Sequence, residues 1–381
     1  MKIKSVLFLL ALGVMSASAA STTTYRVTAV VAGTANGVNN KGDVTGQLSS
    51  NGHAYLYKKG VITDLGAYSP PSLPEQLITV TGLAVNDSDV VVGLIAEGPV
   101  FLGDNREDAF LWKKGILIAI ATGSSEGFSA AATAINNRGE AVGSCDGGET
   151  FNSDSHLGDA ARAFLYRNNT LIDLGTLGGI HSEAGGINNA GAVVGIAETS
   201  DFEIFQAFLY QNGQMQAIGG ALSSYFSPWA INDHGWITGL LAPEPIRFSG
   251  DNDTGPVTEP PGGGAGSTAV LYINGQITKL PSLPGFSGSE GLSINNSGVI
   301  VGNLFGPITD SSGFTREGVT GAFVYNGQMH NLNDLVGGGW KILSVGHISD
   351  TGQIAATGSL PGLTGTYGLL LTPIQSSNFV P

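Results

Sequence analysis

The fold is decided by a short stretch that recurs along the chain and is clearest in Ile187-Asn188-Asn189-Ala190-Gly191-Ala192-Val193-Val194-Gly195. Its first five positions recur, with small changes, in Val38-Asn39-Asn40-Lys41-Gly42, Val85-Asn86-Asp87-Ser88-Asp89, Ile135-Asn136-Asn137-Arg138-Gly139, Ile231-Asn232-Asp233-His234-Gly235, Ile294-Asn295-Asn296-Ser297-Gly298 and Ile348-Ser349-Asp350-Thr351-Gly352. From Asn39 to Ser349 the copies span 310 residues in six intervals, a period of about 52 residues. That length suits a unit of four strands, such as one propeller blade.

Each copy combines a turn with a strand. Asn, Asp and Gly tolerate the positive φ of a tight turn, so the Asn-Asn-x-Gly phrase predicts a hairpin. The run that follows, such as Val90–Gly93 or Val299–Gly302, is apolar and β-branched without alternation. Such runs are typical of strands covered on both faces, as in sheets that pack face to face around an axis.

A second phrase, a short apolar run ending in an aromatic residue, occurs later in six of the units. Its copies are Ala54-Tyr55-Leu56-Tyr57, Ala109-Phe110-Leu111-Trp112, Ala163-Phe164-Leu165-Tyr166, Ala207-Phe208-Leu209-Tyr210, Ala269-Val270-Leu271-Tyr272 and Ala322-Phe323-Val324-Tyr325. A turn follows, clearest at Asn212-Gly213, Asn274-Gly275 and Asn326-Gly327, and Asn-Gly between apolar strands is a strong hairpin signal. Every unit is therefore predicted to hold four antiparallel strands.

The two ends of the repeat array complement each other. After Tyr367–Leu371 the seventh unit lacks a fourth strand, whereas Tyr25–Val31 is predicted as a strand that belongs to no unit. We expect the N-terminal strand to pair into the last blade, because this closure removes an exposed sheet edge. The predicted fold is one all-β domain over residues 21–381, a seven-bladed β-propeller of four-stranded antiparallel blades. An open solenoid of the same units is the alternative and would need capping repeats.

The repeat resembles the HAF family, extracellular repeats named for a His-Ala-Phe triplet. The resemblance covers nearly all of the chain after its first 20 residues, and it is fullest at Leu174–Gly179, ahead of Ile187–Asn189. Only His53 keeps the histidine, in His53-Ala54-Tyr55; the other copies carry Asp108, Arg162, Gln206, Thr268 and Gly321 at that position. The resemblance implies export and a propeller-like fold, and it implies no activity.

The N-terminus has the pattern of a secretory signal peptide over residues 1–20. Lys2 and Lys4 precede an apolar run, Val6–Val14, and a small-residue cleavage site, Ala17-Ser18-Ala19. We therefore expect a secreted or periplasmic protein. No later stretch approaches the roughly 20 apolar residues of a transmembrane helix. Cys145 is the single cysteine and cannot pair within the chain, which favours a bacterial periplasm or exterior over a eukaryotic secretory route.

Charge narrows the range of partners. The chain has 30 acidic and 16 basic residues, and a net negative surface repels nucleic acid and anionic lipid. We expect a monomer that binds a glycan, a cell-surface polymer or a protein.

Strand order assigns the loops to two rims. The Asn-Asn turns and the Asn-Gly turns lie together on one face, here called the short-turn rim. The links between second and third strands and the links between blades lie on the opposite face, the loop-rich rim. The insertions at 94–108, 144–161, 196–205, 240–267 and 303–320 fall on the loop-rich rim and hold 17 of the 30 acidic residues. Such loops suit Ca²⁺ or a cationic or hydroxyl-rich ligand, or they only keep the protein solvated.

Two acidic segments are candidate metal sites. Asp251 and Asp253 begin a segment like a calcium-binding loop, but Gly262 stands where a bidentate Glu is needed, so a flexible Pro/Gly insertion is the alternative. Asp154 and Asp159 flank His156 and together suggest part of a metal site, with a surface histidine as the alternative.

Five further residues of the loop-rich rim are candidate ligand contacts. Trp340, Tyr225 and His181 fall in links between blades, where aromatic rings can stack on sugars or pack at the channel mouth. Arg247 and Arg316 are rare cations among the acidic insertions.

Two functions remain open from the sequence. The favoured hypothesis is an exported non-catalytic binding or scaffolding propeller that holds its ligand on the loop-rich rim. The alternative is an extracellular carbohydrate-active enzyme, a polysaccharide hydrolase or lyase, with its site at the central channel of the same rim. The alternative rests on fold analogy, and no catalytic residue is assigned.

Overall fold

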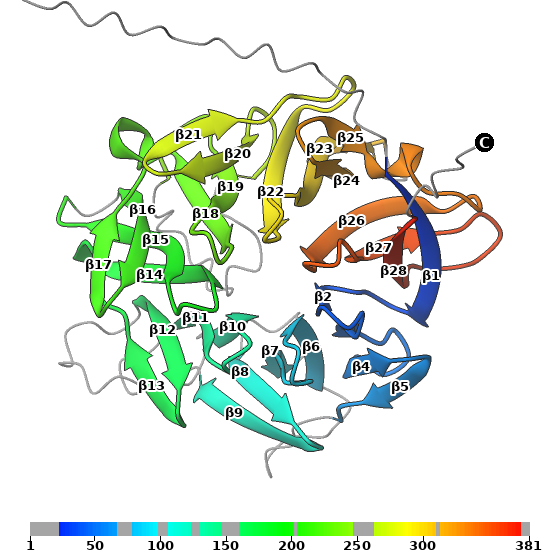
Figure 1. The fold of residues 1–381 in the computed structure, drawn as a ribbon, viewed down its shortest axis with the longest axis horizontal. Helices are drawn as coiled ribbons and strands as arrows, with labels where there is room; N and C mark the ends of the chain where they lie inside the picture. Colours follow the sequence, from blue (N-terminus) through cyan, green and yellow to red (C-terminus); the bar gives the residue numbers. More distant parts are fainter. Residues whose placement is uncertain are drawn as a thin grey trace, which may run out of the picture.

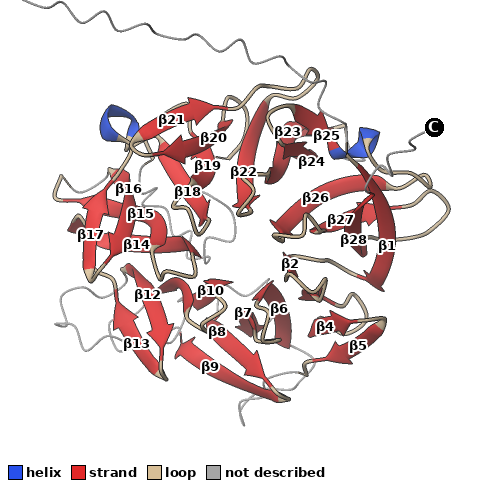
Figure 2. Ribbon diagram, viewed as in Figure 1, coloured by secondary structure: helices blue, strands red, loops and turns tan. Residues whose placement is uncertain are grey.

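The chain forms a closed ring of seven four-stranded antiparallel sheets around a central axis (Figure 1). The computed structural model describes residues 23–66, 78–97, 106–122, 130–146, 160–201, 204–246, 263–309 and 313–374. Strands dominate these ranges, with two short 3₁₀ helices at Gly220–Leu222 and Leu332–Asp334 (Figure 2). The predicted seven-bladed β-propeller is confirmed.

Six blades follow chain order, with the first strand innermost. Blade 1 has β2 (Gly37–Val38), β3 (Val44–Gln47), β4 (Ala54–Lys58) and β5 (Val61–Asp64); blade 2 has β6 (Ile78–Val85), β7 (Val91–Glu97), β8 (Arg106–Lys113) and β9 (Ile116–Thr122); blade 3 has β10 (Ala130–Ile135), β11 (Ala141–Asp146), β12 (Ala161–Arg167) and β13 (Thr170–Asp173). Blade 4 has β14 (Gly178–Ile187), β15 (Val193–Thr199), β16 (Phe205–Gln211) and β17 (Gln214–Ala217); blade 5 has β18 (Phe226–Ile231), β19 (Ile237–Leu241), β20 (Thr268–Ile273) and β21 (Gln276–Lys279); blade 6 has β22 (Gly288–Ile294), β23 (Ile300–Thr309), β24 (Thr315–Tyr325) and β25 (Met329–Asn331).

The seventh blade is built from both ends of the chain, as expected. Its inner strands are β26 (Lys341–Ile348), β27 (Ile354–Ser359) and β28 (Tyr367–Ile374), and β1 (Thr24–Ala32) is its outer strand. Thr24 lies opposite Ile374 and Ala32 lies opposite Tyr367. The blue and red strands therefore lie side by side in Figure 1.

The glycine of each apolar run allows two strands of a blade to approach closely. A Cβ on Gly143 in β11 would lie 1.8 Å from the carbonyl oxygen of Ala131 in β10, and Gly195 and Gly302 stand in equivalent crowded positions. The inner strand opposite carries a β-bulge, for example at Thr133, which lies between the paired residues Ala132 and Ala134. Bulges re-aim side chains, and these turn toward the central axis.

Apolar residues fill the spaces between neighbouring blades. The aromatic phrase supplies most of the largest buried side chains, including Tyr55, Phe110, Phe164, Phe208 and Phe323. Phe164 of blade 3, for instance, packs in a cluster with residues of blade 2. The expectation of strands covered on both faces thus holds.

One insertion on the loop-rich rim is itself strand. Residues 303–320 were expected to form a variable loop, but β23 and β24 pair continuously as far as Thr309 opposite Thr315. Within the described ranges, no helix is long and apolar enough to cross a membrane.

Candidate functional site: the axial channel

An inner ring of buried amides surrounds the axis at the short-turn rim. The first Asn of each repeated phrase uses its Oδ1 to accept backbone N–H groups two and four residues later, as Asn188 does from Ala190 (3.1 Å) and Ala192 (2.9 Å). Its Nδ2 then donates to the carbonyl of the equivalent residue in the next blade, so Asn188 reaches Asn232 at 3.0 Å. The same link joins Asn39 to Asn86, Asn86 to Asn136, Asn136 to Asn188, Asn232 to Asn295, and Asn295 to Ser349.

Ser349 in blade 7 interrupts the inner ring. Its hydroxyl accepts from the backbone N–H of Gln353 at 3.1 Å. Unlike asparagine, serine has no side-chain N–H group that could donate to the backbone carbonyl of Asn39. Six of the seven blade junctions near the axis therefore carry the inter-blade amide bond.

Replacing Ser349 by Asn is expected to stabilise the protein by about 1 kcal/mol, because the new amide would donate to the buried carbonyl of Asn39. Equilibrium unfolding in urea would show this as a higher midpoint with an unchanged slope. Ser297→Asn, a turn substitution in blade 6, is the control and should leave the midpoint where it is. A lower midpoint for Ser349→Asn would contradict the assigned role of the inner ring.

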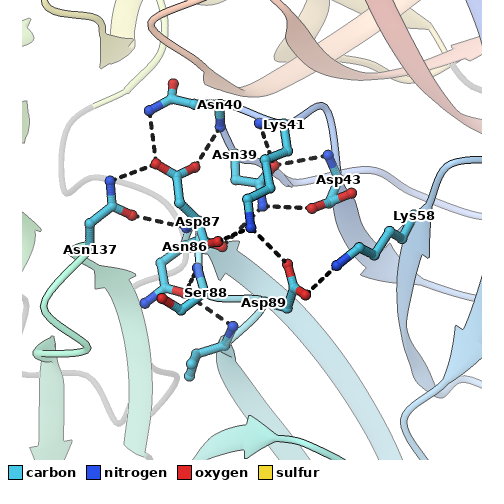
Figure 3. Close-up of polar contacts among 11 residues, drawn as sticks. Asn39, Asn40, Lys41, Asp43, Lys58, Asn86, Asp87, Ser88, Asp89 and Asn137 are labelled. Carbon is cyan, nitrogen blue, oxygen red and sulfur yellow. Dashed lines mark hydrogen bonds and ion pairs between the residues drawn. The ribbon is translucent and has the colours of Figure 1, made fainter.

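An outer ring formed by the second residue of each phrase closes completely. Each backbone N–H donates to the side-chain Oδ1 of the next blade, at 2.7–2.9 Å, around all seven blades: Asn40, Asp87, Asn137, Asn189, Asp233, Asn296, Asp350 and back to Asn40. The second oxygen of each aspartate accepts from flanking amides, as Asp87 does from Asn40 and Asn137 (Figure 3).

The hydrogen bonds of the outer ring favour ionised aspartates. Burial alone would raise the pKa of Asp233, but the bonds donated by Asn189 and Asn296 outweigh it and lower this pKa below its usual value. The two rings enclose a polar cavity of about 150 Å³. The oxygens of both rings already accept hydrogen bonds from the protein. The rings therefore link neighbouring blades to one another.

The channel beyond the rings contains a larger pocket of about 390 Å³. Part of its wall is formed by the residue three positions before each inner-ring residue: Asn36, Leu83, Thr133, Gly185, Trp229, Leu292 and Gly346. In blades 2 to 6 this residue lies at the bulge of the first strand. Glu290, Asn303, Val319, Ser344, Val345 and His347 complete the described lining. Glu290 and Ser344 lie near the starts of β22 and β26, so the pocket extends toward the loop-rich rim.

Polar side chains in this pocket are held in place by neighbours. Glu290 is 2% exposed, and its Oε1 accepts from the Nδ2 of Asn303 at 3.1 Å. The Oδ1 of Asn303 in turn accepts from the backbone N–H of Val345 at 3.2 Å. The Nδ1 of His347 lies 3.0 Å from the carbonyl oxygen of Asn36. Burial lowers the pKa of His347, so its ring is neutral near pH 7.

Trp229 is the aromatic residue of the pocket wall. It lies at the bulge of β18, between the paired residues Pro228 and Ala230. Its indole Nε1 is buried and has no hydrogen-bond acceptor among the described residues. Other atoms of the indole line the pocket, so the ring offers an apolar surface to a ligand.

The structure places the predicted ligand residue His181 inside the blade 3–blade 4 contact. The side chain lies in β14 and is 8% exposed. Its Nδ1 accepts from the backbone N–H of Ala161 at 3.2 Å, and its ring lies against Phe205 with centroids 6.3 Å apart. Burial lowers the pKa of His181, with Glu198 acting in the opposite direction.

The other described candidates on the loop-rich rim lie apart from one another. Trp340 precedes β26 and packs edge-on against Tyr367, with ring centroids 5.9 Å apart. Tyr225 packs against the cluster between blades 4 and 5. Arg316 is exposed on the β23–β24 hairpin, opposite Ile308. The structure therefore does not gather these residues into one site.

The remaining candidates, Arg247, Asp154, Asp159, Asp251 and Asp253, lie outside the described residues. Among the residues that are described, no group of three or more His, Cys, Asp or Glu side chains is placed to hold a metal ion. Calcium binding by the acidic insertions stays a prediction.

Sequence reasoning missed the pocket residues Trp229, Glu290, Asn303 and His347. A signal for part of the wall was present in the repeat, because the position three before each inner-ring residue carries five different residue types in seven otherwise regular copies. The direction of the side chain at this position depends on a bulge in the strand, and the sequence pattern did not reveal that bulge.

No protein-family model matches the chain, and no curated protein gives a significant match. Among solved structures it is similar to TolB from Acinetobacter baumannii, at 14% identity and a TM-score of 0.35, over 76% of this chain and only 64% of TolB. It is similar to an oligogalacturonate lyase from Vibrio parahaemolyticus at 10% identity and a TM-score of 0.47, over 93% and 92% of the two chains. It also resembles the Dos1 propeller at 8% identity and a TM-score of 0.42, over 91% and 95%. These likenesses concern the propeller fold alone.

Proposed function

We propose that this chain is an exported, non-catalytic binding propeller that holds part of a glycan in the axial pocket, reached from the loop-rich rim. The observation that carries the proposal is the indole of Trp229 in the wall of the axial pocket, beside polar side chains that are held in place by hydrogen bonds. The pocket of about 390 Å³ lies within the usual size range of small-ligand sites.

The chemistry of the lining supports a saccharide ligand. An indole offers an apolar face on which a sugar ring can stack. Amide, carboxylate and hydroxyl groups at Asn36, Thr133, Glu290 and Asn303 offer donors and acceptors to further hydroxyls. Glu290 and Asn303 are already oriented by hydrogen bonds, so binding costs little side-chain entropy.

The same lining favours binding over cleavage. Hydrolysis of a glycosidic bond generally needs two carboxyl groups on opposite sides of that bond. Among the described lining residues, Glu290 is the one carboxylate, and it is anchored to Asn303.

The proposal is tested with residues 21–381 and a panel of neutral, acidic and N-acetylated oligosaccharides, followed by calorimetry and by release of reducing or unsaturated ends. We expect binding of at least one saccharide without product. Trp229→Ala should weaken that binding about tenfold or more, since removal of one good stacking group costs about 1.4 kcal/mol or more. Trp340→Ala, a change at the loop-rich rim, is the control that should leave affinity unchanged. Product release, or affinity that depends on Trp340 and not on Trp229, would overturn the proposal.

A further inference from the structure

Positive charge gathers on one arc of the short-turn rim, although the whole chain has a formal charge of −14. After residues 1–20 are set aside, 14 of the 16 basic residues remain, because Lys2 and Lys4 belong to that segment. Half of them stand in the turns of blades 1 to 3: Lys41, Lys58, Lys59, Lys113, Lys114, Arg138 and Arg167. The acidic insertions, by contrast, belong to the opposite rim.

Two of the three cations of blade 1 pair with an aspartate, and a second aspartate, Asp43, also acts on Lys58. Lys41 and Lys58 both pair with Asp89, whose pKa is lowered by Lys58 and Lys41 against the opposing effect of burial (Figure 3). The equivalent turn position in blade 3 is Gly139, which has no charge to offer.

Between blades 2 and 3, one described carboxylate, Glu140, lies beside four cations: Lys113, Lys114, Arg138 and Arg167. Glu140 pairs with Arg138 at 2.6 Å and with Arg167 at 3.8 Å, so one carboxylate serves two guanidinium groups. Lys113 and Lys114 make no ion pair with any described residue. This junction therefore carries a net positive charge that is available to a partner.

These cations border an apolar groove of about 720 Å³. Its described lining includes Val90, Leu111, Ile116, Ile118 and Tyr166. Ile116 is 65% exposed and Ile118 is 39% exposed, so both are exposed apolar side chains of the described structure. An apolar floor with a cationic border fits a ligand that is both apolar and acidic.

The strand that carries these isoleucines is also a free sheet edge. β9 is the outer strand of blade 2, and no strand pairs with its outer edge among the described residues. Its sequence, ILIAIAT, has no charge and no proline, and its seven residues exceed the four of β5 and of β13. Such an edge is a template for the addition of an extended chain.

We propose that the groove between blades 2 and 3 docks an extended acidic segment of another protein, which adds as a strand to the edge of β9. Alternate side chains of an added strand lie on one face of the sheet. Aliphatic side chains of the segment would thus pack on Ile116 and Ile118, while carboxylates at its ends approach Lys113, Lys114 and Arg167. The strand edge and the apolar floor select a polypeptide over an anionic polysaccharide, which has neither backbone N–H groups in register nor aliphatic side chains.

The test uses residues 21–381 and a fluorescein-labelled peptide of nine residues, followed by fluorescence polarisation. The peptide has two glutamates at each end and alternates valine and serine between them, so that its valines share one face. We expect saturable binding that weakens as salt rises. The double variant Lys113→Glu/Lys114→Glu should bind about tenfold or more weakly, because two attractive contacts become repulsive. Lys59→Glu, at the matching turn position in blade 1, is the control and should bind like the unaltered chain. Melting curves would verify that every variant is folded.

Two further probes separate strand addition from charge attraction alone. The same peptide with alternate amides N-methylated should lose binding, because it cannot pair with β9. A peptide with lysine in place of glutamate should not bind. The proposal is overturned if the N-methylated peptide binds as well as its parent, if a sulfated polysaccharide binds through Lys113 and Lys114 when the peptide does not, or if no binding is seen up to about 1 mM peptide.

Discussion

Deletion of β1, residues 24–32, is expected to abolish the stable monomer. This strand connects three blades: it pairs with β28 in blade 7, the N–H of Tyr25 donates to Leu335 of blade 6 at 2.9 Å, and Val30 and Val31 pack with blade 1. Burial of Tyr25, Val30 and Val31 contributes roughly 5–9 kcal/mol at about 1.5–3 kcal/mol per side chain. That is comparable with the whole stability of a typical domain.

The deletion also exposes an apolar edge on β28, whose sequence is YGLLLTPI. Exposed apolar edges pair between molecules, so the shortened chain should form oligomers or aggregates. Light scattering coupled to gel filtration, together with thermal melting by circular dichroism, would measure both effects. A chain that ends at Ile374 is the control, because it keeps β1 and β28. A synthetic peptide of residues 24–32 added in trans should restore the monomer. A deleted chain that stays monomeric and melts like the control would refute the closure.

Asn188→Ala should be the most damaging single substitution in the turns of the short-turn rim. It leaves the backbone N–H groups of Ala190 and Ala192 without their acceptor and the carbonyl of Asn232 without its inter-blade donor. Asn188 is only 6% exposed, so water replaces these bonds poorly. The bond from Ala192 is buried and the bond from Ala190 is partly buried. At about 1–3 kcal/mol for the buried N–H of Ala192 and about 1 kcal/mol for each of the other two bonds, we expect a loss of roughly 3–5 kcal/mol, measured by urea unfolding.

Asn189→Ala is the matched control for this prediction. Its side chain belongs to the outer ring, where it accepts from Asn137 and donates to Asp233; the residue is half-buried, and both hydrogen bonds lie at solvent-exposed positions. Water can hydrogen-bond to the backbone N–H of Asn137 and the carboxylate of Asp233 in place of the Asn189 side chain. The loss of unfolding free energy should therefore be under about 1 kcal/mol. Equal losses for the two variants would show that the inner ring has no special role.

Much of the architecture was accessible from the sequence because it depends on local chemistry. The turn residues Asn188 to Gly191 and the run Ala192–Gly195 repeat often enough to give both the strand order and the number of blades. The closed ring was predicted because the seventh unit lacks a fourth strand and the N-terminal strand belongs to no unit. The pairing of Thr24 with Ile374 confirms this prediction. The Asn-Asn phrase was interpreted as turn chemistry only, whereas most of its amide bonds run between blades.

The candidate site was less accessible. Trp229 and Thr133 reach the channel because each lies at a bulge, and a shift of one residue in a strand turns every side chain to the other face. Trp340, Tyr225 and Arg316 all lie toward the expected rim, but their separation around the ring is a property of the assembled blades.

Turn propensity and strand pattern act over a few residues. Local sequence was therefore enough to predict the four-stranded repeat unit, its number of copies and the closure of the ring. Tertiary structure decided which residues meet at the axis and between blades. Asn40 and Asp350 are 310 residues apart, and Glu140 meets Arg167 across blade 3. Contacts of this kind exist only after closure, because no local preference specifies which side chains the ring brings together.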